Sequence, residues 1–480
     1  MSSKPEMPMG SPFRSVILLL ALCACLPVLA QQKASDRRAW MNPATPVSDD
    51  PRRVPVAPGP RGPEGSLVLR GGRVFDGTGS AAKPATLVIE RNRITAVLPP
   101  DASQWPANAR VIDVTGKTVM PGLIDLHTHL TYTEPGTPAE QAGEGESAAL
   151  RGMERMRLYT ESGITSVRDV ASVGNAPFRL KQWVAENRIP GPRVFAAGQL
   201  ITGTGGHGAE GMWHTGCILQ PRDGVREASG AEDWREAVRE QFKHGADLIK
   251  LASHFTREEV AAAVDEAHTL GLKVTVDAET FYIQWAVEAG VDSVEHPLPR
   301  SDETIQLMAR KGTASVPTLV PYIYIFDLAG GYFGSTSRRF DFSKEANLEM
   351  LRKLKRAGIK LGIGTDLVTD WFRYLPHSYI TELKQFVAAG FTTEQALVAA
   401  THTSAEILGM EDKLGTLTTG KLADVIVVDG QPDRNLDDLR RVTLVVRDGH
   451  VILENGRVVI APHVPVPEPD PKKTVPGREW

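Results

Sequence analysis

The sequence predicts an α/β protein built around a (β/α)8 TIM barrel, with a small composite β-sandwich domain formed from segments on both sides of the barrel. Three observations support this fold. Strand-like and helical patterns alternate through residues 119–412. Strand-rich segments, 66–118 and 413–461, flank that stretch on either side. Polar residues stand at the carboxyl ends of the middle strands, which is where a barrel places its functional site.

The middle segment contains apolar runs that predict eight parallel strands, each followed by a helical pattern. These strands are expected to end near His129, Val170, Thr202, Ala252, Glu279, His296, Val320 and Asp366. An open, doubly wound sheet is the alternative arrangement. We favour the barrel because no Gly-x-Gly-x-x-Gly motif follows the first of these strands.

The helical pattern is clearest from Thr256 to Leu270. Thr256 and Glu259 have the spacing of a capping box, in which each side chain satisfies a backbone N–H at the start of a helix. Apolar residues then recur on one face, and Gly271 follows as a stop signal. The stretch therefore predicts one of the outer helices of the barrel.

The flanking segments carry short runs of β-branched and apolar residues separated by glycines and polar turns. The runs are 66–69, 73–75, 86–90 and 93–97 upstream, and 425–428, 443–446 and 451–453 downstream. Two strand-rich ends around one long middle are most easily packed as a single small β domain. We therefore assign 66–118 and 413–461 to the composite β domain and 119–412 to the barrel.

The first 30 residues are typical of an export signal. Arg14 precedes an apolar run, 16–30, that is too short to cross a bilayer comfortably. We expect residues 1–30 to be a signal peptide and the protein to be exported, either periplasmic or secreted, with no integral membrane span after signal removal. Lipoprotein processing, with a lipid anchor at Cys25, is the alternative.

Residues 31–65 and 462–480 are rich in proline and charged residues and lack a regular apolar period. They predict a disordered Pro-rich linker and a flexible tail. Once the signal has been removed, Cys217 is left without a second cysteine, so no internal disulfide is expected.

Composition excludes some classes of partner. The chain has 480 residues, 41% of them hydrophobic, and a formal net charge of -4. It is long enough for a barrel and a smaller domain, and it offers no basic field for nucleic acid. Assembly into a homo-oligomer stays open.

The most informative motif is Gly-Leu-Ile-Asp-Leu-His-Thr-His at 122–129. His127 and His129 are separated by one residue, so on an extended strand both imidazoles point to the same side and can bind one metal ion. The other strand ends add four more donors, namely Lys250, Asp277, His296 and Asp366. Lys250 lies between Ile249 and Leu251, and burial favours a neutral amine that can take up carbon dioxide as a bridging carbamate.

These motifs, together with Gly-Thr-Asp at 364–366 and the segment 415–424, resemble the amidohydrolase superfamily, specifically its imidazolonepropionase and Xaa-Pro dipeptidase-like branch. The resemblance runs from about residue 67 to residue 453. It implies a metal-dependent hydrolase, with His127, His129, Lys250, Asp277, His296 and Asp366 at the positions of metal ligands. One or two divalent ions are expected, with zinc as the first choice.

Asp277 departs from the pattern of this branch, which usually has a histidine at the end of the fifth strand. A carboxylate also binds zinc or manganese, but it adds negative charge to the site. A two-metal site with Asp277 as a ligand, a one-metal site and a degenerate site are therefore all open.

The resemblance also implies roles for individual residues. Asp366 is the candidate proton shuttle beside a metal-activated hydroxide, and His207, in a glycine-rich loop, is the candidate that stabilises the developing oxyanion. His377 matches a position of the family that faces substrate. Apart from the resemblance, Tyr322 belongs to a group of aromatic residues after the seventh and eighth strands that could line an apolar substrate pocket. The resemblance implies a small-molecule or dipeptide substrate and hydrolysis of amide C–N bonds in dipeptides or N-acyl amino acids. A lactone, ester or organophosphate hydrolase and a non-catalytic metal-dependent binding protein are the alternatives.

Overall fold

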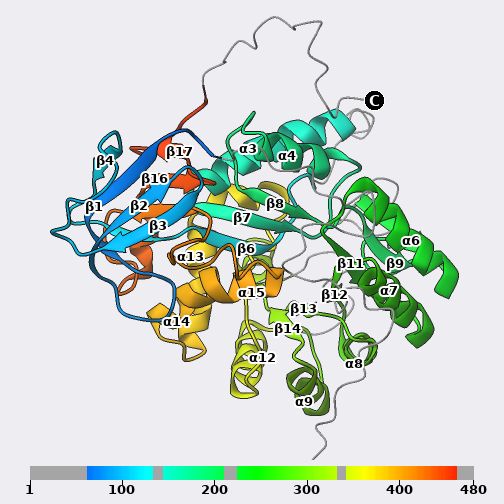
Figure 1. The fold of residues 1–480 in the computed structure, drawn as a ribbon. Coiled ribbons are helices and arrows are strands. Elements are labelled where there is room, and N and C mark those ends of the chain that lie inside the picture. The colour runs from blue at the N-terminus through cyan, green and yellow to red at the C-terminus, as the bar shows by residue number, and fades with distance from the viewer. Residues whose placement is uncertain (1–61, 133–143, 210–223, 332–341, 462–480) are drawn as a thin grey trace, which may run out of the picture.

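The computed structural model describes residues 62–132, 144–209, 224–331 and 342–461. The predicted signal peptide, the lipid anchor at Cys25, the linker up to residue 61, Cys217 and the tail 462–480 lie outside these residues. Within them, the chain forms one nine-stranded sheet, two parallel sheets and a set of helices around the latter (Figure 1).

The nine-stranded sheet combines the two ends of the described chain. Its order is β18-β17-β16-β15-β5-β1-β2-β3, with β4 paired to β1. The strands are β1 Ser66–Val74, β2 Lys83–Glu90, β3 Arg93–Leu98, β4 Arg110–Asp113, β5 Thr118–Pro121, β15 Val425–Val428, β16 Val442–Arg447, β17 His450–Glu454 and β18 Arg457–Val458. Strands β5 and β15 pair antiparallel and join the upstream half to the downstream half. Two runs expected separately, 66–69 and 73–75, are one strand with a register shift between Leu69 and Gly72.

The two parallel sheets hold the strands of the middle segment. One has the order β6-β7-β8 and the other the order β10-β9-β11-β12-β13-β14. The strands are β6 Leu123–Thr128, β7 Ile164–Asp169, β8 Arg193–Ala196, β9 Leu200–Gly203, β10 Val225–Ala228, β11 Leu248–Ala252, β12 Lys273–Asp277, β13 Ser293–Glu295 and β14 Ala314–Val316. Strands β6, β7, β11 and β13 are buried along their whole length, as expected for parallel strands covered on both faces.

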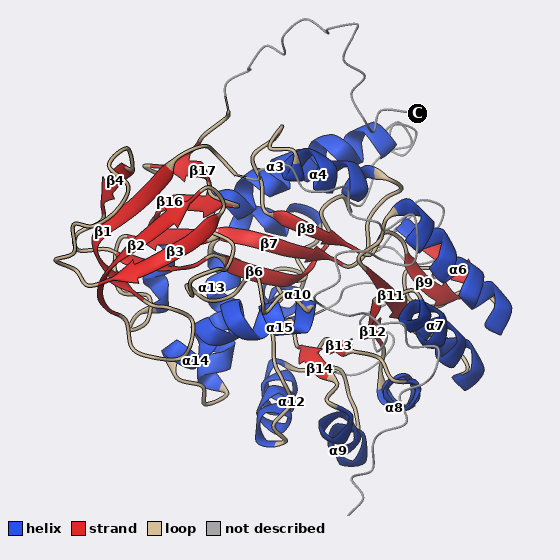
Figure 2. Ribbon diagram, in the orientation of Figure 1, coloured by secondary structure: helices blue, strands red, loops and turns tan. Residues whose placement is uncertain are grey.

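Helices lie outside these strands and cover them (Figure 2). They are α3 Glu144–Glu161, α4 Ala176–Ala185, α6 Ala231–His244, α7 Arg257–Thr269, α8 Thr280–Ala289, α9 Asp302–Lys311, α10 Leu319–Asp327, α12 Lys344–Arg356, α13 His377–Ala388, α14 Thr393–Val398 and α15 Ser404–Leu408. Three short segments form other helix types: the 3-10 helices η3 Thr369–Tyr374 and η5 Leu436–Arg441, and the π-helix η4 Ala399–Thr403. In the part of the chain that the structure describes, no helix is both long enough and apolar enough to cross a bilayer.

Helix α7 confirms the pattern expected from Thr256 to Leu270. Thr256 is the N-cap, and it forms the reciprocal capping box with Glu259. The apolar face, Val260 included, is buried against the sheet.

The third predicted strand is interrupted. Strand β8 pairs with β7, whereas β9 pairs with β11, so the two pieces belong to different sheets. At the break, the backbone N–H of Gln199 donates to Gln241 Oε1 rather than to a neighbouring strand. A side chain from α6 thus satisfies the backbone where the strand pairing stops.

The strand expected to end near Val320 is shorter than predicted. Strand β14 ends at Val316, and residues from Leu319 onward form α10. Periodicity does not separate a buried strand from a buried helix in so short an apolar run. The expectation of one strand through this run was therefore wrong.

The segment 360–367 lies between the two parallel sheets. The N–H of Ser315 donates to the carbonyl of Lys360 on one side, and the N–H of Leu126 donates to the carbonyl of Ile363 on the other. The N–H of Asp366 donates to the carbonyl of His127 at 2.8 Å. These bonds bring Asp366 to the carboxyl end of β6.

Candidate metal centre

Two histidines stand at the carboxyl end of β6. His127 is 1% exposed and His129 is 8% exposed, and their ring centroids lie 5.2 Å apart. His127 Nδ1 lies 2.7 Å from Glu295 Oε2, and His129 Nδ1 lies 3.0 Å from the carbonyl of Ala171. Because a carboxylate and a carbonyl accept from each Nδ1–H, the Nε2 lone pair of both rings is left for another partner.

That partner in this structure is Asp366. Its Oδ1 lies 3.1 Å from His129 Nε2 and 3.4 Å from His127 Nε2. Asp366 has φ of 46°, a conformation that is uncommon for a residue other than glycine and that turns the chain sharply after the segment 360–367. One donor atom from each of the three side chains lies within 4.8 Å of the others.

A second group forms around Asp277 at the end of β12. Asp277 Oδ2 lies 3.1 Å from His296 Nε2 and 3.2 Å from His207 Nε2. His207 is brought there by the loop after β9, where its N–H donates to the carbonyl of Ser253 at 2.5 Å. Asp277 thus occupies a position between two imidazoles.

The two groups are adjacent. His296 Nδ1 lies 3.7 Å from Asp366 Oδ2, and the rings of His296 and His127 have centroids 4.8 Å apart. Lys250, on β11, is 2% exposed, and Asp277 and Asp366 are among the charges that act on it. The structure therefore brings together all six residues expected to be ligands, with His207 beside them.

Burial and neighbouring charges together set the pKa values of these groups. It lowers the pKa of His127 well below its ordinary value, with the Lys250 ammonium acting in the same direction. Burial also lowers the pKa of Lys250, although Asp277 and nearby carboxylates oppose the shift. For Asp366, burial alone would raise the pKa, but His127 and the other facing imidazoles outweigh it and lower the pKa. A neutral imidazole beside an ionised carboxylate is the state in which both bind a metal.

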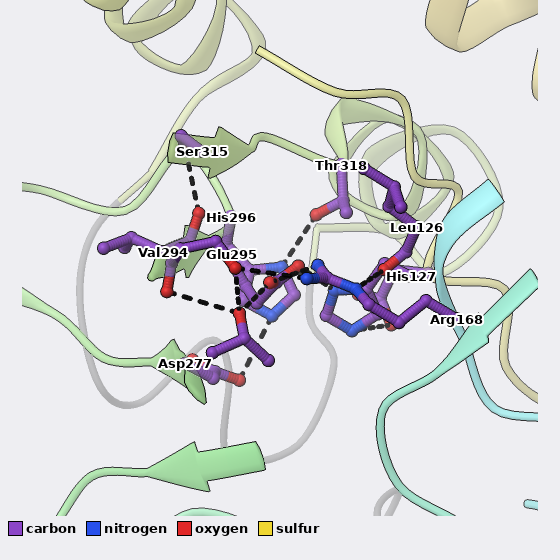
Figure 3. Close-up of polar contacts among 12 residues, drawn as sticks. Leu126, His127, Arg168, Asp277, Val294, Glu295, His296, Ser315 and Thr318 are labelled. Carbon is purple, nitrogen blue, oxygen red and sulfur yellow. Dashed lines mark hydrogen bonds and ion pairs between the residues drawn. The ribbon is translucent and has the colours of Figure 1, made fainter. Parts of the chain in front are cut away.

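A buried ion pair, for which the sequence predicted no role, holds His127 in place. Glu295 is fully buried; its Oε2 faces His127 Nδ1, and its Oε1 accepts from Arg168 Nη2 at 2.6 Å and from the hydroxyl of Thr275 (Figure 3). Arg168 also donates to the carbonyl of Leu126 at 2.6 Å. The guanidinium therefore fixes the carboxylate and the backbone of β6 together.

A signal for this pair does exist in the sequence. Arg168 lies within the strand 164–169, beside Val167, and Glu295 ends the strand 293–295, after Val294. A charge within a fully buried strand is rarely tolerated without a partner, so two such charges of opposite sign predict a pair.

The two candidates for substrate binding differ in their surroundings. Tyr322, on α10, is 3% exposed, and its ring centroid lies 6.1 Å from that of His296. His377 is exposed at the start of α13, where its Nδ1 lies 2.9 Å from Arg440 Nη2. The structure thus brings Tyr322 to the site and places His377 against η5.

The donor set fits a divalent metal. Buried imidazole nitrogens with Nδ1 already satisfied, together with carboxylate oxygens, are the ligands that zinc and related first-row ions prefer. His127, His129 and Asp366 would hold one ion. His296, Asp277 and Lys250 would hold a second.

The chain is similar to known proteins along most of its length. The model of the Amidohydrolase family matches residues 118–452. The ochratoxinase of Aspergillus niger is 26% identical over 435 residues, which cover 82% of this chain and 87% of the ochratoxinase. The imidazolonepropionase of Geobacillus sp. (strain WCH70) is 26% identical over 387 residues, covering 73% of this chain and 85% of that enzyme.

The fold of the chain is also similar to that of a solved structure. A prolidase in complex with N-methylphosphonate-L-proline is 29% identical, with a TM-score of 0.72 over 81% of this chain and all of the prolidase. Since the family model covers more than half of the chain, this protein belongs to the amidohydrolase family.

Proposed function

We propose that this protein is an exported, metal-dependent hydrolase that cleaves the amide bonds of dipeptides or N-acyl amino acids. The observation that carries the proposal is the convergence of three donor atoms, from His127, His129 and Asp366, within 4.8 Å of one another. The similarity to a prolidase and to imidazolonepropionase supports C–N bonds as the target.

The proposal includes a closed (β/α)8 barrel and the division into a barrel, 119–412, and a composite β domain, 66–118 with 413–461. The hydrogen bonds of the segment 360–367 to β14 and β6 support closure, with that segment as the eighth strand. A barrel collects the carboxyl ends of its strands at one mouth, so it accounts for donors that come from five separate chain segments.

A divalent metal, with zinc as the first choice, supplies a Lewis acid that polarises the scissile carbonyl and acidifies water. Side chains of the protein would transfer the proton and stabilise the developing negative charge. The carboxylate of Asp366, whose Oδ1 faces His127 and His129, takes the proton of the attacking water and delivers it to the leaving amine nitrogen. His207 donates from its ring to the carbonyl oxygen as charge develops there.

Lys250 and Asp277 decide how many ions are bound. A carbamate on the Lys250 amine would offer two oxygens as metal ligands where an unmodified amine offers one nitrogen. A carbamate forms when a neutral amine reacts with carbon dioxide. Burial lowers the pKa of Lys250 and so favours this neutral amine. Asp277, which faces His296 and His207, then takes the place that a histidine has in related enzymes.

The test is metal content and turnover measured on the same preparation of protein without residues 1–30. Metal-free protein is reconstituted with zinc, manganese or cobalt and screened against Xaa-Pro dipeptides, Xaa-Arg dipeptides and N-acyl amino acids. We expect bound metal and hydrolysis of at least one amide. A His129→Asn variant is the matched control, because it removes one donor and keeps the size of the side chain. Absence of metal and of turnover in the unaltered protein would contradict the proposal.

Two alternatives give different results in this assay. A lactone, ester or organophosphate hydrolase would turn over an ester and leave the amide of the same acid unchanged. A binding protein with a degenerate site would take up metal and turn over neither. Localisation is tested separately, by fractionating cells that express the full chain: export predicts a shortened product outside the cytoplasm.

A further inference from the structure

His296 has an unusual environment on the side away from Asp277. Its Nδ1 lies 2.7 Å from the hydroxyl of Thr318, and both residues are buried (Figure 3). When Nε2 binds a metal, Nδ1 carries the proton and donates it to that hydroxyl. Thr318 therefore fixes both the tautomer and the orientation of the ring.

Thr318 is also the N-cap residue of α10, yet its side chain does not cap the helix. A threonine at this position normally accepts a hydrogen bond from an N–H of the first helical turn. Here the hydroxyl is turned to His296 instead. Thr318 has φ of 42° and ψ of 64°, a left-handed conformation that is rare for a β-branched residue and that must be held by its surroundings.

The missing cap comes from another helix. Glu382, in the second turn of α13, accepts a hydrogen bond from the N–H of Val320 at 2.9 Å through its Oε2. Glu382 is fully buried, and among the described residues its Oε1 has no hydrogen-bond partner. Burial raises the pKa of Glu382 to about 8. Burying a carboxyl group costs free energy that hydrogen bonds must offset. The bond from the N–H of Val320 is therefore the contact that explains why an acid stands at this position.

Helix α13 touches α10 at a second polar point. Ser378 Oγ lies 2.9 Å from the hydroxyl of Tyr324, and Ser378 precedes Glu382 by one helical turn on the same face. The Ser378 contact therefore fixes the middle of α10, while Glu382 fixes its first turn.

We propose that Glu382 is a positioning residue for His296: by capping α10 in place of Thr318, it leaves the threonine hydroxyl available to His296 Nδ1. The chain of contacts runs from Glu382 Oε2 to the N–H of Val320, through the backbone to Thr318, and from its hydroxyl to the imidazole. The inference rests on the proposed function, in that it assigns His296 to a metal.

The test is a double-mutant cycle on zinc affinity, measured by competition with a chromogenic chelator. Glu382→Leu removes the cap at similar size, and Thr318→Val removes the hydroxyl. We expect each change to weaken zinc binding about tenfold or more. If Glu382 acts through Thr318, the double variant binds zinc no more weakly than Thr318→Val alone. Losses that add in the double variant, or unchanged affinity in Glu382→Leu, would overturn the proposal.

Two further variants separate positioning from folding. Glu382→Gln keeps an oxygen that accepts from Val320, so it should retain the zinc affinity of the unaltered protein. Ser378→Ala breaks the other polar contact between α13 and α10, so it should lower the melting temperature without changing zinc affinity. Equal loss of affinity in Ser378→Ala and Glu382→Leu would mean that general damage to α10, and not the cap, is responsible.

An NMR experiment on metal-free protein tests the inference independently of the proposed function. Metal-free protein labelled with 15N in histidine is compared in the unaltered form, in Glu382→Leu and in Glu382→Gln, with the His296 ring signals assigned from a His296→Asn spectrum. Glu382→Leu should move the Nδ1 resonance of His296, and Glu382→Gln should leave it in place. An unmoved resonance in Glu382→Leu overturns the inference even if the protein binds zinc; a moved one supports it even if the protein binds none.

Discussion

Glu295 Oε2 lies 2.7 Å from His127 Nδ1, in a part of the protein from which water is almost fully excluded. The same carboxylate is held on its other oxygen by Arg168. The imidazole is therefore oriented before any ion arrives, because its acceptor cannot rotate away without leaving the guanidinium unpaired. Loss of the negative charge of Glu295 should therefore disturb the orientation of His127.

Glu295→Gln should weaken metal binding about 10-fold to 100-fold, because an amide is a poorer acceptor for His127 Nδ1–H and leaves Arg168 without its counter-charge. Zinc affinity by chelator competition is the measurement. Glu266→Gln is the matched control, since Glu266, on the outer helix α7, pairs with Arg239 of α6. Equal affinity in the two variants would contradict the orienting role.

Lys250→Ala should abolish both metal binding and hydrolysis, because the bridging group is lost. Asp277→His should retain both, since an imidazole can replace the carboxylate as a ligand. Metal stoichiometry and turnover of the best amide substrate are measured side by side. Recovery of the Lys250→Ala variant with a short carboxylic acid would support the bridge, and activity without any added acid would rule it out.

Gly364→Ala should displace the metal centre. A Cβ at this position would lie 2.8 Å from the Cβ of His127 and 2.5 Å from Val316 Cγ1, so β6 or its neighbour must move. Gly122→Ala is the control, because its Cβ would collide with Thr165 at the opposite end of β6. Both variants should melt at a lower temperature, but only Gly364→Ala should bind zinc more weakly. The reverse order of affinities would refute the steric argument.

Asp169 predicts a pH dependence of stability. Burial raises its pKa from 3.8 to about 7, so the folded state favours the protonated acid. The corresponding stabilisation is present at low pH and is lost as the pH rises through about 7. Relative to Asp169→Asn, the unaltered protein should therefore lose unfolding free energy between about pH 4 and about pH 7 in urea titrations, and the difference should stay constant at higher pH. A gap between the two proteins that stays constant from about pH 4 to about pH 7 would exclude this assignment.

Much of this molecule could be predicted where one local pattern acts alone. The spacing of His127 and His129 needs only the alternation of a strand, and α7 needs only its cap and its apolar face. The convergence of Lys250, Asp277, His296 and Asp366 followed from the family resemblance and from the geometry of strand ends.

The features that were missed depend on partners far apart in the sequence. At the break between β8 and β9, Gln241 of α6 accepts a hydrogen bond from the backbone, and Glu295 pairs with Arg168, 127 residues earlier. The first turn of the helix that begins at Leu319 donates a hydrogen bond to Glu382 of α13. A pattern within one segment contains no information about such contacts.

The pairing of β5 with β15 has a consequence for how the chain acquires its structure. The central pair of the nine-stranded sheet cannot form until β15, residues 425–428, has been synthesised and can pair with β5, residues 118–121. During synthesis, β1 and β2 can pair early as an antiparallel hairpin and β5 can add to β1, but β5 then keeps an open edge until β15, about 300 residues later, has been made and packed. The last-made strands thus complete the first-made ones, and a chain shortened before β15 would expose that edge to other chains rather than fold into a smaller version of the protein.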